Sequence, residues 1–280
     1  MSSREGASDM KKQAAKSAFT LLELIFVIVI LGIVASIGSE IIANVYQQYI
    51  IQRAQHRASL KTELAALQIA NRLRSAIPGT VYRIKNDNSY ELIDSSMANS
   101  DVYIGLQWVG SDTDSFDANS TPGWSGFCDV DASSKDSIVT RGSNLAMANT
   151  IQASLGNTSG KFAIFFPYDT TPYFGIGTAD TIALDNNAST IYEHYKLAWS
   201  SYALICENTT GDCGDLSLYY NFPPQGIAIN TTDSNSSVLL RNVTTFRFTG
   251  AGRTLRFKIC KEEEIGEDFN ITACKEKAVF

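Results

Sequence analysis

Residues 19–39 are an almost unbroken apolar run that contains a single acid, Glu23, near its start. The 21 residues of this run span about 30 Å as a helix, which matches the hydrocarbon core of a bilayer. A carboxylate at the centre of a bilayer costs roughly 2.5–3.5 kcal/mol. The pattern therefore predicts a membrane-spanning helix whose one charge requires a partner.

After Glu40 the pattern becomes amphipathic, and residues 40–77 are expected to continue the helix as a stalk. The apolar positions recur at steps of three and four residues. They are Leu60, Leu64, Leu67, Ala70, Leu73 and Ile77. The stripe is short and rich in alanine, so we expect it to pack on a sheet rather than form a coiled coil. Pro78-Gly79 predicts the end of the helix.

Residues 78–280 lack helical periodicity and contain short runs rich in β-branched and aromatic residues, separated by Gly, Asn, Asp and Ser. The predicted strands are 81–84, 90–93, 102–109, 162–166, 197–205, 216–222 and 226–229, with a hairpin formed by 245–248 and 255–259. Residues 110–160 are expected to form a loop-rich insertion. The fold class is therefore α+β, with a long N-terminal helix packed on the antiparallel sheet of a globular head.

Charge divides the chain in the same way. Residues 40–77 carry a net charge of +3, and residues 78–280 hold 14 basic and 24 acidic side chains, a net charge of −10. Because binding to phosphates needs basic residues, we expect the head to make no contact with nucleic acid. An acidic head suits a soluble surface that faces outward.

The residues before the apolar run are basic, with Lys11, Lys12 and Lys16. Positive residues stay in the cytoplasm, so the N-terminus is expected inside and the head outside the inner membrane. A conventional signal peptide would have a shorter apolar region followed by a small-residue cleavage site. Here the small residue, Ala18, precedes the run. The start of translation, Met1 or Met10, stays open.

The lysine-rich leader, Ala18 and the sequence Phe19-Thr20-Leu21-Leu22-Glu23 together resemble the class III signal of type IV pilins and type II secretion pseudopilins. The resemblance covers about residues 11–45. It implies that a prepilin peptidase removes residues 1–18 by cutting between Ala18 and Phe19, and that Phe19 is then N-methylated. The family usually has glycine before the cut, where this chain has Ala18.

The resemblance also implies a role for Glu23, which becomes the fifth residue after cleavage. In a filament, Glu23 of one subunit would neutralise the amine of Phe19 of a neighbour. A buried unpaired charge is heavily penalised, so subunits out of register would be rejected. Glu23 is therefore the predicted assembly residue.

The chain has five cysteines, and a compartment outside the inner membrane permits disulfides. A Cys206–Cys213 bond would close a short loop, and a Cys260–Cys274 bond would resemble the C-terminal disulfide loop of many pilins. Other pairings are open. In this pairing Cys128 stays a buried free thiol. The spacings fit no common zinc site and the chain has two histidines, His56 and His194, so no metal is expected.

The sequence contains eight Asn-x-Ser/Thr triplets. Four of them have an acid two residues earlier, which resembles the extended acceptor of bacterial oligosaccharyltransferases. They are Asn119, Asn187, Asn235 and Asn270. The alternative, weighted equally, is an Asn- and Thr-rich loop surface without glycans.

No catalytic motif is present, so an enzyme and a cofactor are not expected. The leading interpretation is a structural subunit, minor or specialised because its head is large, of a type IV pilus-like filament. The alternatives are a type II secretion pseudopilin and a signal-anchored periplasmic binding protein that does not polymerise. Expected partners are other pilin subunits, the prepilin peptidase and methylase, and an inner-membrane assembly platform.

Overall fold

The computed structural model describes residues 20–87, 89–94, 103–117, 120–207, 212–224, 234–251, 254–265 and 269–279. The chain divides into two compact units, Met1–Gln52 and Arg53–Phe280. Helix α1, Leu21–Arg74, contributes residues to both units.

Helix α1 begins just after Thr20. The Thr20 side-chain oxygen accepts a hydrogen bond from the Glu23 amide at 3.3 Å, which satisfies one of the free N–H groups of the first turn. The helix ends at Arg74, earlier than the predicted residue 77. There the Ser75 hydroxyl donates to the Arg72 carbonyl at 2.9 Å, and Pro78, which has no N–H, follows closely.

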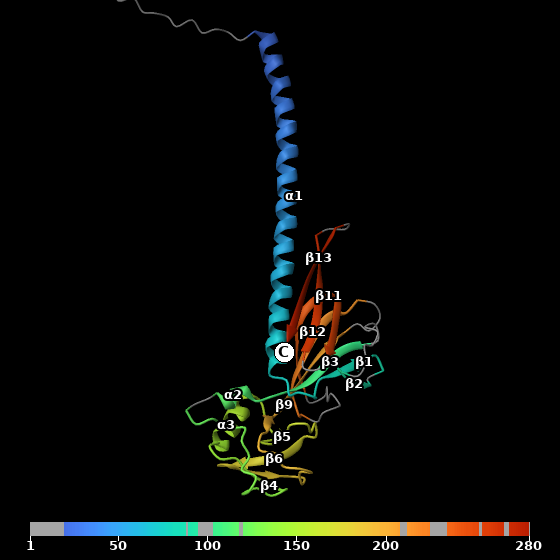
Figure 1. Cartoon of the computed structure of the whole chain (residues 1–280). Helices are drawn as coiled ribbons and strands as arrows, with labels where there is room; N and C mark the ends of the chain where they lie inside the picture. The colour runs from blue at the N-terminus through green and yellow to red at the C-terminus, as the bar shows by residue number, and fades with distance from the viewer. Residues whose placement is uncertain are drawn as a thin grey trace, which may run out of the picture. The chain divides into compact units, whose positions relative to one another are not determined.

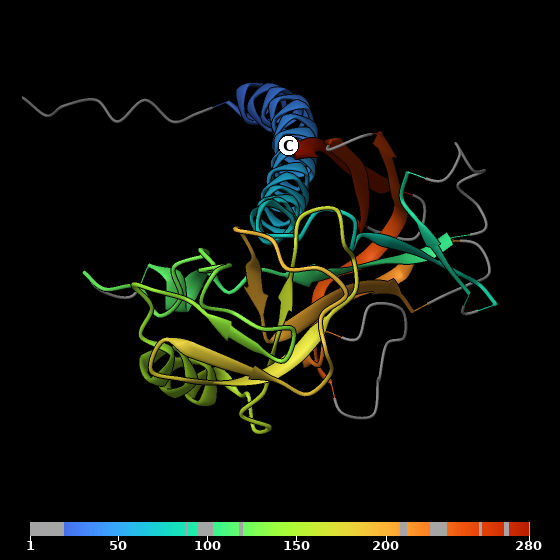
Figure 2. The same cartoon turned by 60° about the horizontal axis from the view of Figure 1, so that its bottom comes forward.

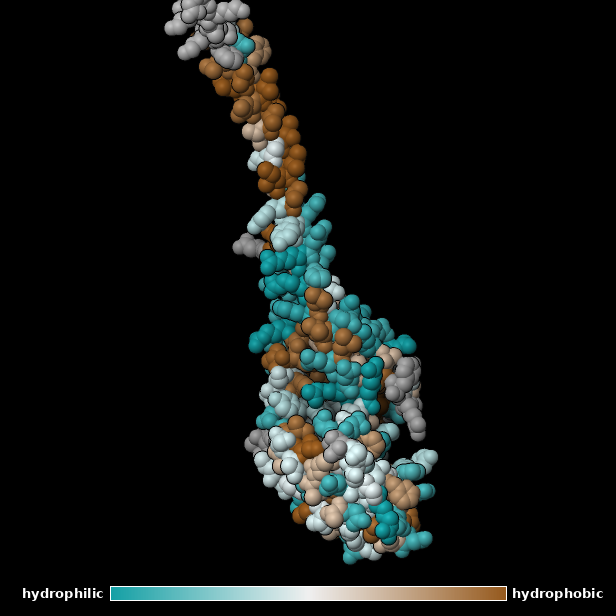
Figure 3. All heavy atoms as spheres, turned by 90° about the vertical axis from the view of Figure 1, so that its left-hand side faces the viewer, coloured by the Kyte–Doolittle hydropathy of each residue, from teal (hydrophilic) through white to brown (hydrophobic). Residues whose placement is uncertain are grey.

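In the first unit, α1 carries large apolar side chains on all its faces. Its most apolar stretch is long enough to cross a membrane, and none of that stretch is buried within the protein. Hydrophobic residues cover this part of the helix in Figure 3. A helix that is apolar all round requires an apolar surrounding, so this unit is built to be covered by lipid or by other chains.

The second unit contains an eight-stranded antiparallel sheet in the order β13-β12-β11-β10-β9-β3-β1-β2 (Figure 1). Its strands are β1 (Tyr82–Lys85), β2 (Tyr90–Leu92), β3 (Tyr103–Gly110), β9 (Ser200–Cys206), β10 (Gly214–Phe222), β11 (Asn235–Ala251), β12 (Thr254–Glu264) and β13 (Asn270–Val279). The predicted hairpin of 245–248 and 255–259 is the central part of β11 and β12, which pair Phe246 with Ile259. The predicted strand 226–229 lies outside the described residues.

The C-terminal part of α1, from Ala58 to Leu73, packs on this sheet through mostly small side chains. Its buried residues are Ala58, Thr62, Ala65, Ala66, Ile69, Ala70 and Leu73. Most of them share one core with Trp108, Leu204, Phe257 and Ile259 of the sheet. Alanine places little volume between the elements, so the helix lies close to the large side chains of the sheet. The α+β class, with a long helix on antiparallel strands, is confirmed.

The predicted contact stripe of this helix is wrong for its N-terminal half, from Leu60 to Leu67. Leu60, Leu64 and Leu67 are 50, 59 and 41% exposed, whereas Ala66 and Ile69 are 0 and 1% exposed. The leucines recur with a helical period but on the face opposite the alanines. Leu73 and Ile77 are buried as predicted.

Residues 111–199 form a second lobe of the head with its own five-stranded sheet, in the order β4-β7-β6-β5-β8. The elements are α2 (Thr113–Phe116), β4 (Ser137–Val139), α3 (Leu145–Leu155), β5 (Phe162–Phe165), β6 (Tyr173–Thr178), β7 (Thr181–Leu184) and β8 (Lys196–Ala198). Figure 2 shows this sheet with α3 beside it, in green to yellow. Val109 at the end of β3 packs with Phe165 and Ala198 and so joins the two sheets.

The region expected as a loop-rich insertion is therefore larger and more regular than the sequence suggested. Residues 110–160 include α3 and β4, and β4 pairs with β7 from a later part of the chain. The predicted strand 197–205 is divided at Trp199 between β8 and β9, which belong to different sheets. The lobe is thus one long excursion between β3 and β9.

Candidate functional site

The N-terminal part of α1 holds the residue that the sequence singles out, Glu23. It lies in the first turn of the helix, where a carboxylate interacts favourably with the helix dipole. Its side chain is exposed and is surrounded in sequence by Leu21, Leu22, Leu24 and Ile25, which are also exposed. Glu23 is thus an acid within an apolar surface. Ala18 and Phe19 lie outside the described residues.

The stalk part of α1 is fixed to the edge of the sheet by two groups of charges. Glu63 binds Lys277 of β13 and has Lys275 at 3.6 Å. Glu263 of β12 lies 3.8 Å from Arg57 of the helix and 3.1 Å from Lys261, which is buried. Nothing in the sequence pattern indicated the pairs between helix and sheet, because their partners are about 200 residues apart.

The hydrogen bond from Lys277, supported by Lys275, lowers the pKa of Glu63 below its ordinary value. A lowered pKa means that the stabilising effect is present above the ordinary glutamate pKa of about 4.3 and is lost as the pH falls through the value in the folded protein. We therefore expect Glu63→Gln to lower the melting temperature slightly at neutral pH, because solvent screens an ion pair at the surface, and to match wild type in strong acid. Thermal unfolding across pH checks this, and a pH-independent difference would contradict it.

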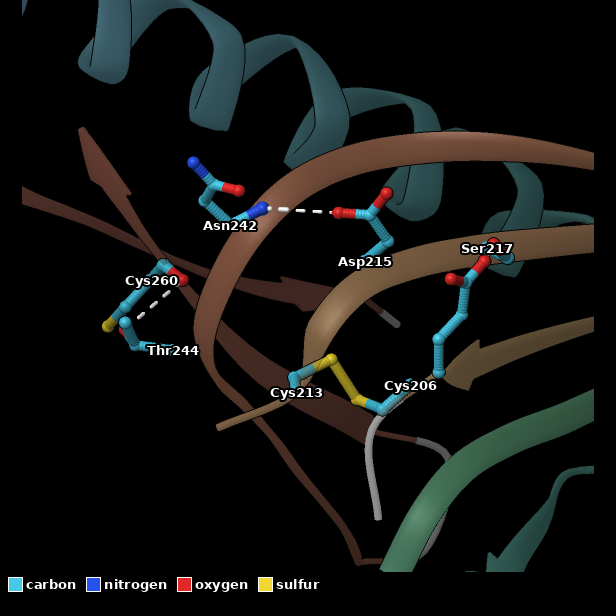
Figure 4. Close-up of a disulfide and its surroundings, with 8 residues drawn as sticks. Cys206, Cys213, Asp215, Ser217, Asn242, Thr244 and Cys260 are labelled. Carbon is cyan, nitrogen blue, oxygen red and sulfur yellow. Dashed lines mark hydrogen bonds between the residues drawn. A yellow bond between two sulfur atoms is a disulfide. The ribbon is translucent and has the colours of Figure 1, made fainter. Parts of the chain in front are cut away.

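Two disulfides stabilise the head. Cys206 at the end of β9 bonds to Cys213, which precedes β10, and Cys260 bonds to Cys274. These are the two pairings considered from the sequence. Figure 4 shows the first, with Asp215 and Ser217 of β10 and Asn242 of β11 near it. The Asn242 amide donates to the Asp215 carboxylate at 3.4 Å.

The second disulfide connects paired strands. Cys260 of β12 and Cys274 of β13 are register partners, with their Cα atoms 4.0 Å apart. The bond therefore attaches the last strand to its neighbour and holds Lys275 and Lys277 beside the helix. Cys128 is a free thiol buried in the second lobe, where burial raises its pKa.

Three of the four predicted acceptor asparagines are described, and all three are exposed. Asn187 lies in a loop of the second lobe, whereas Asn235 and Asn270 begin β11 and β13. Asp185, the acid before Asn187, bonds to Lys161 at 2.8 Å. Asn119 lies outside the described residues.

The described part of the chain provides no metal centre, since no three His, Cys, Asp or Glu side chains in it come close enough to bind an ion. His56 lies on the stalk helix, and His194 packs against the ring of Phe127 at 6.2 Å in the second lobe. The two histidines are thus in different elements.

Comparison with known proteins identifies one segment. The family described as the prokaryotic N-terminal methylation motif matches residues 13–39. The chain carries the class III signal of type IV pilins and pseudopilins. The matched residues include Glu23 and the whole apolar run, residues 19–39. Neither a curated protein nor a solved structure matches the chain.

The motif and the apolar helix together support a membrane-anchored, type IV pilin-like or pseudopilin protein. The motif points to a structural family rather than to an enzyme. The motif also implies that the protein is a pilin-type subunit processed by a prepilin peptidase. The head, residues 78–280, lies beyond the match.

Proposed function

We propose that this protein is a minor or specialised subunit of a type IV pilus-like filament assembled from the inner membrane. The observation that carries the proposal is Glu23, an exposed acid in the first turn of a helix whose apolar side chains are exposed on every side. The size of the head favours a minor or specialised subunit over a major one.

The physical basis is the different cost of Glu23 in two surroundings. In lipid, an unpaired carboxylate is unfavourable by a few kcal/mol. In a filament, the amine of Phe19 of a neighbouring subunit would neutralise it, and the apolar side chains would be covered by other helices. Assembly therefore exchanges an unfavourable solvent for a matched partner, and subunits in the wrong register leave the charge buried and unpaired.

Before assembly, the apolar helix anchors the protein in the inner membrane, with the N-terminus in the cytoplasm and the head in the periplasm. Lys11, Lys12 and Lys16 favour this orientation. A membrane peptidase cuts between Ala18 and Phe19, and Phe19 is methylated. An inner-membrane platform then moves the subunit into the filament. The acidic head and its two disulfides suit the final position outside the membrane.

Mass spectrometry of the native protein purified from membranes tests the processing step. We expect an N-terminal peptide that begins with Phe19 and carries one methyl group. The same chain with Phe19 preceded by a charged residue, Ala18→Lys, is the matched control and is expected to keep its leader. A mature N-terminus at any other residue would contradict the proposed processing.

Glycosylation of the head is a second, separate element of the proposal. Asn187, Asn235 and Asn270 are exposed and therefore accessible to a transferase, and Asn119 belongs to the same sequence class. Peptide mass spectra of the same preparation test it, and unmodified asparagine at all four positions would exclude it.

A further inference from the structure

The stalk part of α1 has an apolar surface on the side away from the sheet. It consists of Leu60, Leu64 and Leu67, which are 41 to 59% exposed. Figure 3 looks onto the left-hand side of Figure 1 and shows hydrophobic patches among hydrophilic residues below the apolar part of the helix. Arg53 lies on the same helix face, because the seven residues that separate it from Leu60 make about two turns. We call Arg53, Leu60, Leu64 and Leu67 the outer stripe.

Arg53 is available for a partner. Its side chain is exposed, and among the described residues it forms no ion pair. Arg57, the next basic residue along the helix, differs in this respect because it lies 3.8 Å from Glu263 of its own head. The outer stripe therefore presents one uncommitted positive charge followed by three leucines.

The first unit of the chain contains the complement of this stripe. Glu23, Ile30, Val34 and Ile37 repeat its spacing of seven, four and three residues, with an acid in the place of Arg53. All four side chains are exposed, and the three apolar ones are 55 to 63% exposed. The two sets are 30 residues apart at every position.

We propose that the outer stripe of one copy binds the apolar helix of a second copy, with Arg53 opposite Glu23 and Leu64 opposite Val34. The two helices would be parallel and offset by 30 residues, about 45 Å at 1.5 Å per residue. The spacing of three and four residues is that of helices that pack side by side. Glu23 would then have a stalk arginine as a partner in addition to the amine of Phe19.

Charge distinguishes this offset from two alternatives. An arrangement without offset would place Arg53 against Arg53. An offset of 34 residues would place Leu60, Leu64 and Leu67 opposite Phe26, Ile30 and Ile33, which are also apolar. It would, however, pair Glu23 with Arg57, which already contacts Glu263. At an offset of 30 residues each leucine of the outer stripe lies opposite an apolar residue, and Arg53, which has no ion pair among the described residues, lies opposite Glu23.

The contact depends on the proposed filament and is too small to form alone. A stable interface in solution uses about 20–30 residues a side, whereas the outer stripe has four. It therefore acts between copies that are already held in one filament, where the effective concentration is high. Its role is to set the offset between neighbouring subunits.

Cysteine cross-linking tests the offset in cells that express the full chain. The natural cysteines do not interfere, since four form disulfides and Cys128 is buried. We expect the double variant Val34→Cys/Leu64→Cys to form disulfide-linked multimers under oxidation that disappear on reduction. The matched control Val34→Cys/Leu60→Cys moves the second thiol by four residues, about 6 Å along the axis, and is expected to form far fewer.

Other results would overturn the proposal. Equal cross-linking in both variants, dimers from Leu64→Cys alone, or no cross-links in cells that still make filaments would each exclude the offset. Arg53→Glu provides an independent measurement, with an expected fall of about tenfold in filament yield, equivalent to ~1.4 kcal/mol. Lys61→Glu is its control, because Lys61 lies outside the stripe, and an equal fall in both would also contradict the pairing. Absence of wild-type filaments would instead defeat the proposed function.

Discussion

Glu23→Ala is expected to abolish filaments and to leave the protein inserted in the membrane. The substitution removes the charge that is unfavourable in lipid, so insertion becomes easier by roughly 2.5–3.5 kcal/mol at most. It also removes the partner of the Phe19 amine and of Arg53, whose charges would then be buried without compensation in a filament. Loss of one member of a buried pair costs about 3–5 kcal/mol. This energy corresponds to a more than hundredfold change in the equilibrium constant for assembly.

The measurement is electron microscopy of filaments sheared from cells, together with immunoblots of the membrane fraction. Glu40→Ala is a matched control, since it removes an acid from the same helix beyond the apolar run. We expect Glu40→Ala to retain filaments. Normal filaments from Glu23→Ala, with the protein still in the membrane, would exclude the assembly role of Glu23.

Ile69→Ala is expected to destabilise the head by about 2–5 kcal/mol, the range for truncating a buried isoleucine. Ile69 is 1% exposed and shares its core with Trp108 and Leu204 of the sheet, so the lost volume leaves a cavity. Leu67→Ala is the matched control, two residues away on the helix. Its side chain is 41% exposed, and we expect a much smaller effect.

Urea unfolding of the full chain in detergent, followed by tryptophan fluorescence, measures both variants. Trp108 lies in the affected core and reports its opening. A larger effect from Leu67→Ala than from Ile69→Ala would mean that the leucine face, and not the alanine face, packs on the sheet. The outer stripe would then be unavailable to a second copy.

The sequence predicted the N-terminal element well because its signals are local. The apolar run, the early acid and the basic leader are all read within about 30 consecutive residues, and the matched motif covers 13–39. The end of the helix was predicted to within a few residues, since proline and glycine act on their immediate neighbours. The strands with alternating apolar residues, such as 255–259, were also found.

The covered face of the stalk was harder to predict, because periodicity shows that positions share a face but not which face is covered. Leucine is usually the better core residue, so Leu60, Leu64 and Leu67 were assigned inward. The close approach of helix and sheet selects small residues instead, with Ala66 at 0% exposure. Their large exposed neighbours form the outer stripe, for which we propose a second copy as the partner.

The second lobe shows a different limit. Helix α3 does have local signals, with Asn144 at its N-terminal cap and Gly156 in a left-handed conformation at its end, φ 116°. These were hidden among many other Asn, Ser and Gly residues. Strand β6 contains two glycines, and β13 has three consecutive charged residues, Lys275, Glu276 and Lys277, so neither resembles an ordinary strand in sequence. Their pairing with distant strands defines them.

The location of the wild-type protein shows most directly whether this chain is a filament subunit. Filaments are sheared from cells and labelled with an antibody against the head for electron microscopy. We expect label on surface filaments, at intervals or at their ends, as suits a minor subunit. Label confined to the membrane fraction or to short periplasmic structures, with bare filaments outside, would contradict it and favour a secretion pseudopilin or an unpolymerised anchor.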